Sequence, residues 1–277
     1  MKHPLIGIFD SGVGGLTVLA EAARFLPAAR YLYFADSGFA PYGEKSRSEI
    51  LERCFKIADK MAQRNVDAIV VACNTATSSA IVEMRQRYSF PIIGMEPALK
   101  PAAENAHDGT ILVLGTAFTI REPKYQELLQ RFQRQREIIS LPCPGLVNLI
   151  EAGGKDLPEM NARLKQILGD LPASNISAVV LGCTHFVFLK NNLRTIFKTN
   201  IEFFDGNLGT ARQLVRMLAE RGHVCPEASP EANTPRIKPQ IEIDTSGERH
   251  HVLFLCETLL SELMNNQIKP FMPMNND

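Results

Sequence analysis

The sequence has no excess of charge of either sign and no long apolar run. Its 277 residues carry 30 Lys and Arg against 30 Asp and Glu, so the formal net charge is zero. A surface without net charge has no global field to hold nucleic acid or an anionic membrane, and we expect neither as a partner. No apolar run approaches the roughly 18 residues that span a bilayer. The start lacks the apolar core and cleavage site of a signal peptide, so we expect a cytoplasmic protein.

The cysteines form no CxxC pair, and no group of Cys and His has the spacing of a metal site. In a reducing compartment they should be free thiols, so each serves either packing or chemistry. The chain also lacks a GxGxxG loop and a lysine in its paired motifs, so we expect neither a metal ion nor another cofactor. The six are Cys54, Cys73, Cys143, Cys183, Cys225 and Cys256.

Short β-branched runs alternate with amphipathic segments of helical spacing along the whole chain. Continuous apolar strands that alternate with helices favour parallel sheets covered on both faces, the α/β class. The predicted strands span residues 5–9, 31–34, 68–71, 91–94, 111–116, 138–141, 178–181 and 241–243. The predicted helices span 16–25, 46–63, 77–88, 123–134, 210–220 and 249–264, with further helical segments before 168.

The pattern restarts near Pro101 and repeats the first half. Residues 68–75 align with 178–185 at a constant offset of 110, and residues 6–10 align with 111–115 at an offset of 105. A repeat of this length predicts two similar doubly wound domains related by a pseudo-two-fold axis, with the active site in the cleft between them.

The predicted domain boundaries follow from this repeat. The first domain takes residues 1–100 and 210–277, and the second takes 101–209. Four prolines in the stretch 221–240 predict an exposed, stiff connection.

Cys73 and Cys183 occupy the same place in the two repeats, just after a predicted buried strand. The polar residues that follow each cysteine should begin a helix, where free N–H groups and the helix dipole favour a thiolate or a bound carboxylate. A lone cysteine after an apolar strand is commonly a packing residue. Two such thiols at related positions could instead remove a proton from one face of a carbon and return one to the other.

The loop of residues 10–15 follows the first predicted strand. It does not complete a GxGxxG dinucleotide fingerprint, because Thr17 stands at the last glycine position. It is either a capped tight turn or a small anion-binding turn in which Asp10 faces an ammonium group or steers a nearby thiol. Asp36 and the Pro41–Gly43 segment add polar groups to the same sheet edge.

His185 stands two residues after Cys183. A single histidine is commonly structural, and a Cys-x-His pair supplies only two metal ligands. General acid–base work beside a reacting thiol fits the pattern better. By its pattern alone, Glu151 is an ordinary surface carboxylate.

The chain resembles the glutamate racemases of the aspartate/glutamate racemase family. The resemblance covers nearly the whole chain, and its most specific motifs are DSGxGG, CNT and GCTH in that order. The matching segments are GIFDSGVGGLTV (7–18), YFADSGFAPYGEKS (33–46), VVACNTATSSA (70–80), GMEPALKPA (94–102), VLGT (113–116), LVNLIEAG (146–153), VLGCTH (180–185) and TSGE (245–248).

The resemblance implies a cofactor-independent isomerase that interconverts L- and D-glutamate and supplies D-glutamate for peptidoglycan. Cys73 and Cys183 would act as alternating base and acid, Asp10 and His185 would tune them, and Glu151 would lie near the second cysteine. The implied substrate contacts are Asp10, Ser11, Pro41, Tyr42, Gly43, Asn74, Thr75, Thr184 and His185. A homodimer is compatible with the sequence.

Three alternatives stay open. The first is an aspartate racemase or another isomerase with a cysteine pair. The second is a two-domain amino-acid binder without catalysis. The third is a hydrolase that uses Cys183 and His185, which would leave Cys73 without a role. Phe186–Phe188 departs from the aromatic-Pro-Leu run that often follows Cys-Thr-His in the family.

Overall fold

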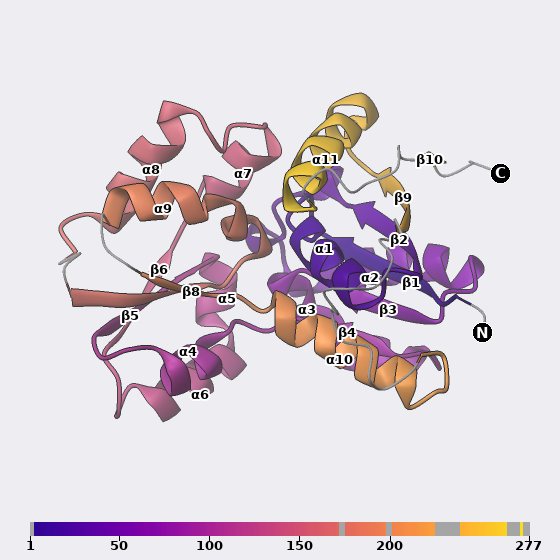
Figure 1. The fold of residues 1–277 in the computed structure, drawn as a ribbon, viewed down its shortest axis with the longest axis horizontal. Coiled ribbons are helices and arrows are strands. Elements are labelled where there is room, and N and C mark those ends of the chain that lie inside the picture. The colour runs from indigo at the N-terminus through magenta and orange to yellow at the C-terminus, as the bar shows by residue number, and fades with distance from the viewer. Residues whose placement is uncertain (1–2, 172–174, 198–200, 225–238, 265–271, 274–277) are drawn as a thin grey trace. The chain divides into compact units, whose positions relative to one another are not determined.

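The computed structural model describes residues 3–171, 175–197, 201–224 and 239–264, and the backbone of 272–273. The chain forms two compact units, Met1–Met95 with Asn207–Asp277 and Glu96–Gly206 (Figure 1). Among the described helices, none combines the length and the apolar character that crossing a membrane requires. Most of the proline-rich stretch 221–240 lies outside the described residues.

The first unit is built on a six-stranded parallel sheet with strand order β10-β9-β2-β1-β3-β4. Helix α1 packs against α10 and α11, whereas α2 packs against α3. The strands are β1 (Leu5–Asp10), β2 (Arg30–Ala35), β3 (Ala68–Val71), β4 (Ile92–Gly94), β9 (Gln240–Thr245) and β10 (Met272–Pro273). The helices are α1 (Leu16–Phe25), α2 (Arg47–Gln63), α3 (Asn74–Arg87), α10 (Asn207–Ala219) and α11 (Arg249–Leu263), with 3-10 helices η1 (Ser37–Phe39) and η2 (Tyr42–Glu44).

The second unit is built on a four-stranded parallel sheet with strand order β6-β5-β7-β8. Helices α7, α8 and α9 lie on one side of this sheet, and α4 and α6 on the other (Figure 1). The strands are β5 (Thr110–Gly115), β6 (Ile138–Pro142), β7 (Ile176–Leu181) and β8 (Glu202–Phe204). The helices are α4 (Leu99–Asn105), α5 (Ala117–Arg121), α6 (Pro123–Phe132), α7 (Leu146–Glu151), α8 (Pro158–Leu168) and α9 (Lys190–Phe197), with the 3-10 helix η4 (Thr184–Leu189).

The two sheets share one strand order, in which the first strand lies between the second and the third. In each unit the chain therefore adds its second strand on one side of the first strand and its third strand on the other side. Because each crossover connection is right-handed, this reversal places helices on both faces of the sheet. The prediction of two parallel-sheet α/β domains is confirmed. Ligands of such folds bind at the carboxyl ends of the strands where the order reverses. That point lies between β1 and β3 in the first unit and between β5 and β7 in the second.

Burial explains the apolar runs of the central strands. All six residues of β1 are buried, as are all four of β3. A strand covered on both faces has no solvent side, so apolar residues follow one another instead of alternating with polar ones. Helix α2 is amphipathic and begins with a capping box, in which Ser46 and Glu49 satisfy each other's backbone N–H groups.

Candidate active site

Asp10, Ser11 and Cys73 meet at the switch point of the first sheet. Asp10 ends β1 and Cys73 follows β3, the strand that pairs directly with β1. The Cys73 thiol donates to Ser11 Oγ at 3.7 Å, and the Ser11 hydroxyl donates to Asp10 Oδ1 at 2.9 Å. All three side chains are buried. A buried carboxylate therefore connects through one hydroxyl to the thiol.

The turn after β1 depends on glycine because the chain passes close to its neighbours. A Cβ atom on Gly15 would lie 2.8 Å from Asp10 Cβ and 2.9 Å from the Tyr33 hydroxyl oxygen. Both distances are shorter than real side chains allow. The Tyr33 hydroxyl donates to the Gly12 carbonyl at 2.6 Å and holds the turn against β2. The absence of a side chain at Gly15 thus lets the loop stay close to the edge of the sheet that carries Cys73.

Helix α3 begins at Asn74, directly after Cys73, as the polar residues after the cysteine predicted and three residues before the start that apolar spacing gave. The Cys73 sulfur is the N-cap acceptor and receives the Ala76 N–H at 3.5 Å. Cysteine is not among the usual N-cap residues, which explains why the spacing of apolar residues misplaced the start. An N–H donor and the positive end of the helix favour the thiolate form of Cys73.

Asn74 and Thr75 occupy the first turn of α3, and both are buried. Only 4% of the Asn74 surface is exposed, yet neither its side-chain oxygen nor its nitrogen has a hydrogen-bond partner among the described residues. A buried amide without partners costs free energy unless a ligand satisfies it. The Asn74 amide is thus a candidate contact for a bound molecule with both donors and acceptors.

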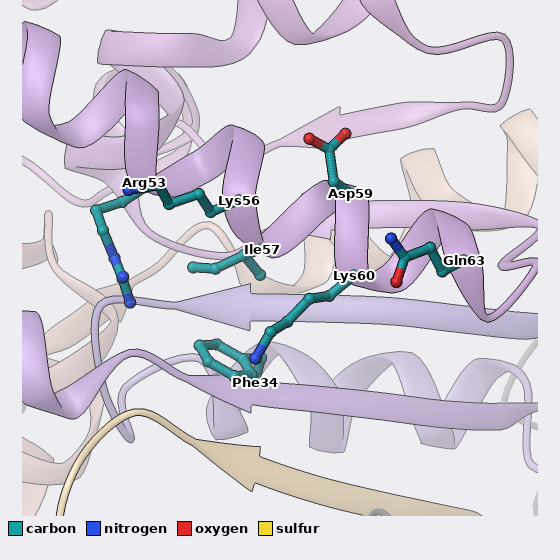
Figure 2. A pocket seen from close by; sticks show the side chains of 7 residues that line it. All are labelled: Phe34, Arg53, Lys56, Ile57, Asp59, Lys60 and Gln63. Atoms are coloured by element: carbon teal, nitrogen blue, oxygen red, sulfur yellow. The ribbon is translucent and has the colours of Figure 1, made fainter. Parts of the chain in front are cut away.

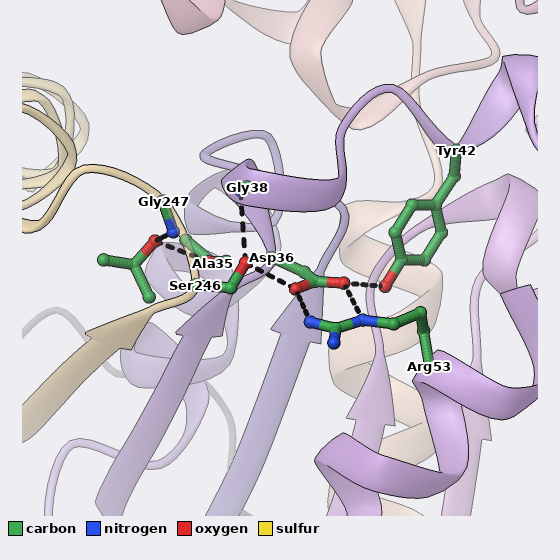
Figure 3. A network of polar contacts seen from close by, with 8 residues as sticks. Ala35, Asp36, Gly38, Tyr42, Arg53, Ser246 and Gly247 are labelled. Carbon is green, nitrogen blue, oxygen red and sulfur yellow. Dashed lines mark hydrogen bonds and ion pairs between the residues drawn. The ribbon is translucent and has the colours of Figure 1, made fainter.

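Asp36 holds the segment that carries Pro41, Tyr42 and Gly43. Its side chain is 0% exposed and accepts the Tyr42 hydroxyl at 2.6 Å. The Arg53 guanidinium of α2 binds both carboxylate oxygens, with Nε at 3.0 Å from Oδ2. Figure 3 shows this carboxylate between the tyrosine, the guanidinium and Ser246. The aspartate therefore anchors the loop that carries Tyr42 to α2.

The same network also joins the loop to the C-terminal part of the unit. Ser246 follows β9, and its hydroxyl donates to Asp36 Oδ1 at 2.6 Å. Its Oγ accepts the Gly38 N–H at 3.1 Å. Burial, followed by the charge of Asp36, raises the pKa of Tyr42, so its hydroxyl stays protonated and remains a donor. Asp36, Arg53 of α2 and Ser246 after β9 thus together fix one short loop.

Cys183, His185 and Glu151 form a second chain of contacts, wholly within the second unit. Cys183 follows β7 as Cys73 follows β3. His185 Nδ1 lies 3.8 Å from Cys183 Sγ, and His185 Nε2 lies 2.6 Å from Glu151 Oε1. Glu151 is the last residue of α7, and His185 is only 1% exposed. Thr184, between the thiol and the imidazole, is also buried.

The pKa of His185 lies well above its ordinary value. Burial opposes the charged imidazolium, but hydrogen bonds to Cys183 and Glu151 and the charges of both groups outweigh it. The imidazolium thus lies in series between the Cys183 sulfur and the Glu151 carboxylate. Such a series can hold a proton next to the sulfur and release it.

The segment after Cys183 is helical, as predicted, but it is not an α-helix. Thr184–Leu189 is a 3-10 helix, and Cys183 makes no side-chain cap hydrogen bond to it. Phe186 and Leu189, three residues apart, are both buried. The three-residue repeat of a 3-10 helix places such a pair on one side. The second thiol therefore has a histidine where the first has a backbone N–H.

The other described cysteines are buried packing thiols. Cys54, Cys143 and Cys256 are buried, and burial raises the pKa of Cys143 to about 12. Cys225 lies outside the described residues. Across the part of the chain that the structure describes, no three His, Cys, Asp or Glu side chains are arranged to hold a metal ion.

Arg53 is the residue that the sequence reasoning missed. It lies on the same stripe of α2 as the buried Ile50 and Ile57. A cation at a core-facing position of an amphipathic helix needs a buried partner, and that position was the available signal. Its partner Asp36 was recognised only as one polar residue of the sheet edge.

Comparison with known proteins assigns the chain to a family. The family model described as Asp/Glu/Hydantoin racemase matches residues 6–214. The chain belongs to this racemase family. Glutamate racemase from Clostridium acetobutylicum is 44% identical over 219 residues, which cover 79% of this chain and 85% of that protein. Glutamate racemase from Clostridium kluyveri is 40% identical over 93% of this chain and 97% of its own.

Solved structures of the racemase family share the fold. The crystal structure of Escherichia coli glutamate racemase, in complex with L-glutamate and the activator UDP-MurNAc-Ala, is 30% identical with a TM-score of 0.78. The match covers 98% of each chain. The resemblance to glutamate racemases that the motifs indicated is confirmed, and with it the assignment to the racemases, a class of isomerases.

Proposed function

We propose that this chain interconverts L- and D-glutamate without a cofactor, using two cysteine thiols, and supplies D-glutamate for peptidoglycan. One observation carries the proposal. In each unit a cysteine stands two residues after the third strand of an equally ordered sheet, and its sulfur is hydrogen-bonded to a side chain. The full-length relationship to proteins named glutamate racemases supports glutamate as the substrate.

The reaction exchanges one proton on carbon 2. A thiolate removes the α-proton, the electron pair passes into the α-carboxylate, and the second thiol delivers a proton to the opposite face. Cysteine suits both roles because its ordinary pKa of about 8.5 lies close to neutral pH. The two-base mechanism requires Cys73 and Cys183 to act on opposite faces of the same carbon.

The residues next to each thiol would bind the substrate and prepare the sulfur. Ser11, Asn74 and Thr75 supply hydroxyl and amide groups beside Cys73, and Thr184 supplies a hydroxyl beside Cys183. Hydrogen bonds to the α-carboxylate stabilise the negative charge that develops when the α-proton leaves. Asp10 would meet the substrate ammonium, while Pro41–Gly43 would line the same site.

A racemisation assay tests this function directly. The optical rotation of L-glutamate and of D-glutamate should each decay to zero, with a chelator and a carbonyl-reactive reagent present throughout. L-Aspartate should be racemised far more slowly. Equal rates on aspartate would contradict the assignment to glutamate, and activity that returns only with added metal would contradict cofactor independence.

Asn74→Ala should weaken glutamate binding without weakening the fold. Its buried amide has no described partner, so a bound substrate should satisfy it. A hydrogen bond to a charged group contributes about 1.5–3 kcal/mol, so we expect KM to rise roughly 10- to 100-fold. Steady-state kinetics measure this change, and thermal unfolding should show no loss of stability.

Ser79→Ala is the matched control. Ser79 lies on the same helix and is fully buried, and its hydroxyl also has no described partner. It is placed in no substrate contact, so KM should stay unchanged. An equal rise of KM in both variants would assign the effect to the packing of α3 and contradict the role of Asn74.

A further inference from the structure

A pocket of about 360 Å³ lies in the first unit beside α2, apart from the groups named above for the reaction. Phe34 of β2 forms its floor, and Ile57 of α2 adds an apolar wall (Figure 2). This volume lies within the range of small-molecule sites, about 300–1,000 Å³. A flat apolar group can pack on the phenylalanine ring once the Lys60 amine, which lies over that ring, moves aside.

Cations surround this apolar floor. Arg53, Lys56 and Lys60 recur along α2 at helical spacing, and all three line the pocket. The Lys60 amine lies 5.4 Å from the centroid of the Phe34 ring, and Figure 2 shows it extended from the helix toward that ring. Among the described residues, Lys60 has no ion pair. Lys56 pairs with Glu52 on the exposed surface, where such a contact contributes little.

The acidic residue that lines the pocket is already engaged. Asp59 accepts the Tyr88 hydroxyl at 2.6 Å and pairs with Arg87 at 2.8 Å. Its charge is therefore compensated from α3 and not by the lysines of the pocket. The cationic groups that remain suit a phosphate or a carboxylate.

Arg53 connects the pocket to the loop that carries Tyr42. Arg53 lines the pocket, and its guanidinium holds Asp36, which accepts the Tyr42 hydroxyl. An anion that binds Arg53 competes with Asp36 for the same cation. A weaker hold on Asp36 loosens the Tyr42 hydrogen bond and the loop around it.

We propose that this pocket binds a small organic anion, a phosphate or carboxylate on a flat apolar group, and that its occupancy loosens the Tyr42 loop through Arg53. The first part of this proposal, that the pocket binds an anion, does not depend on the proposed function. The second part, that binding regulates the enzyme, rests on the proposed racemase activity. Binding to the enzyme without substrate therefore tests the pocket separately from the function.

Phenyl phosphate is a suitable probe, and phosphorus NMR can follow its titration into the full chain. It should bind saturably and more tightly than inorganic phosphate. Lys60→Gln should weaken it about three- to fivefold, and Lys56→Gln/Lys60→Gln further, because each removes one partly screened charge. Lys124→Gln, which removes an exposed lysine of α6, is the control and should change nothing.

Three binding outcomes would overturn the site. These are no saturable binding, equal binding of inorganic phosphate and phenyl phosphate, or equal weakening by the control variant. The fold itself is not at issue, because the lysine substitutions alter exposed side chains, and thermal unfolding verifies that each variant is folded.

Kinetics then test the second part of the proposal. Phenyl phosphate should raise the KM for glutamate more than it lowers kcat. The Lys60→Gln variant should keep the activity of the unliganded enzyme and lose most of this response. Binding without any change in KM would overturn the coupling through Arg53 while leaving the pocket in place.

Discussion

Replacing Cys73 or Cys183 with serine should abolish racemisation, with a loss of at least about 1,000-fold in either variant. General acid–base groups contribute typically 10²–10⁴-fold, and a hydroxyl is far less acidic than a thiol. Polarimetry with each enantiomer measures the loss. The two enantiomers of glutamate have equal free energies, so kcat/KM must fall equally in both directions.

A half-reaction separates the two thiols. On a glutamate analogue with a leaving group at carbon 3, removal of the α-proton expels that group and forms a double bond between carbons 2 and 3. By the family resemblance, Cys73 would take the proton of the D-enantiomer and Cys183 that of the L-enantiomer. Cys73→Ser should then eliminate only from the L-analogue, and Cys183→Ser only from the D-analogue.

Cys143→Ser is the matched control for both variants. Cys143 is also buried and also follows a strand of the second sheet, and its thiol donates to the Leu141 carbonyl at 3.4 Å. It should keep racemisation and both eliminations. If Cys73→Ser kept full activity while Cys183→Ser lost both eliminations, a single-cysteine mechanism would replace the proposed one, and a hydrolase would become the leading alternative.

His185→Asn should affect one half-reaction far more than the other. His185 contacts Cys183, so removing its proton-holding ring should slow elimination from the L-analogue roughly 100-fold or more. Elimination from the D-analogue, which depends on Cys73, should remain. Glu151→Gln should change the same half-reaction less, because Glu151 acts through the imidazole. Equal loss with both analogues would contradict this assignment.

The raised pKa of His185 also predicts how stability depends on pH. A group whose pKa is higher in the folded state than in the unfolded state stabilises the fold. This stabilisation is complete at pH values below the unfolded pKa of about 6.5. The stabilisation is lost as pH rises through the folded pKa. Urea unfolding from pH 6 upward should show this decline in the wild type, and His185→Asn should show less of it. Parallel pH profiles would contradict the charged imidazole.

The alternation of apolar runs and helices was sufficient to predict two parallel sheets. Apolar spacing also predicted α1 with the bounds that the structure shows. It missed α4 because Pro101 looked like a break, although proline is tolerated in the first turn, where its N–H would have no partner. The spacing of apolar residues therefore predicts which side chains are buried better than it predicts where a helix begins.

The candidate site was predictable where a single chain segment carries the contact and unpredictable where distant segments meet. The adjacency of Cys183 and His185 is contained in a single motif, GCTH. The hold of Arg53 and Ser246 on Asp36 joins α2 and the end of β9 to the end of β2, and no spacing rule connects them. The roles assigned to the site residues, the domain boundaries and the homodimer remain predictions.

The pairing of β2 with β9 determines the order in which parts of the fold can form while the protein is synthesised. Arg30 of β2 lies opposite Gln240 of β9, so the partner strand leaves the ribosome about 210 residues later. The second unit is one uninterrupted stretch, Glu96–Gly206, and all of it emerges before that strand. Until then the first sheet has an open edge at β2, and the carboxylate of Asp36 lacks Ser246. The loop that carries Tyr42 therefore acquires its last anchor only after the whole second unit has been synthesised.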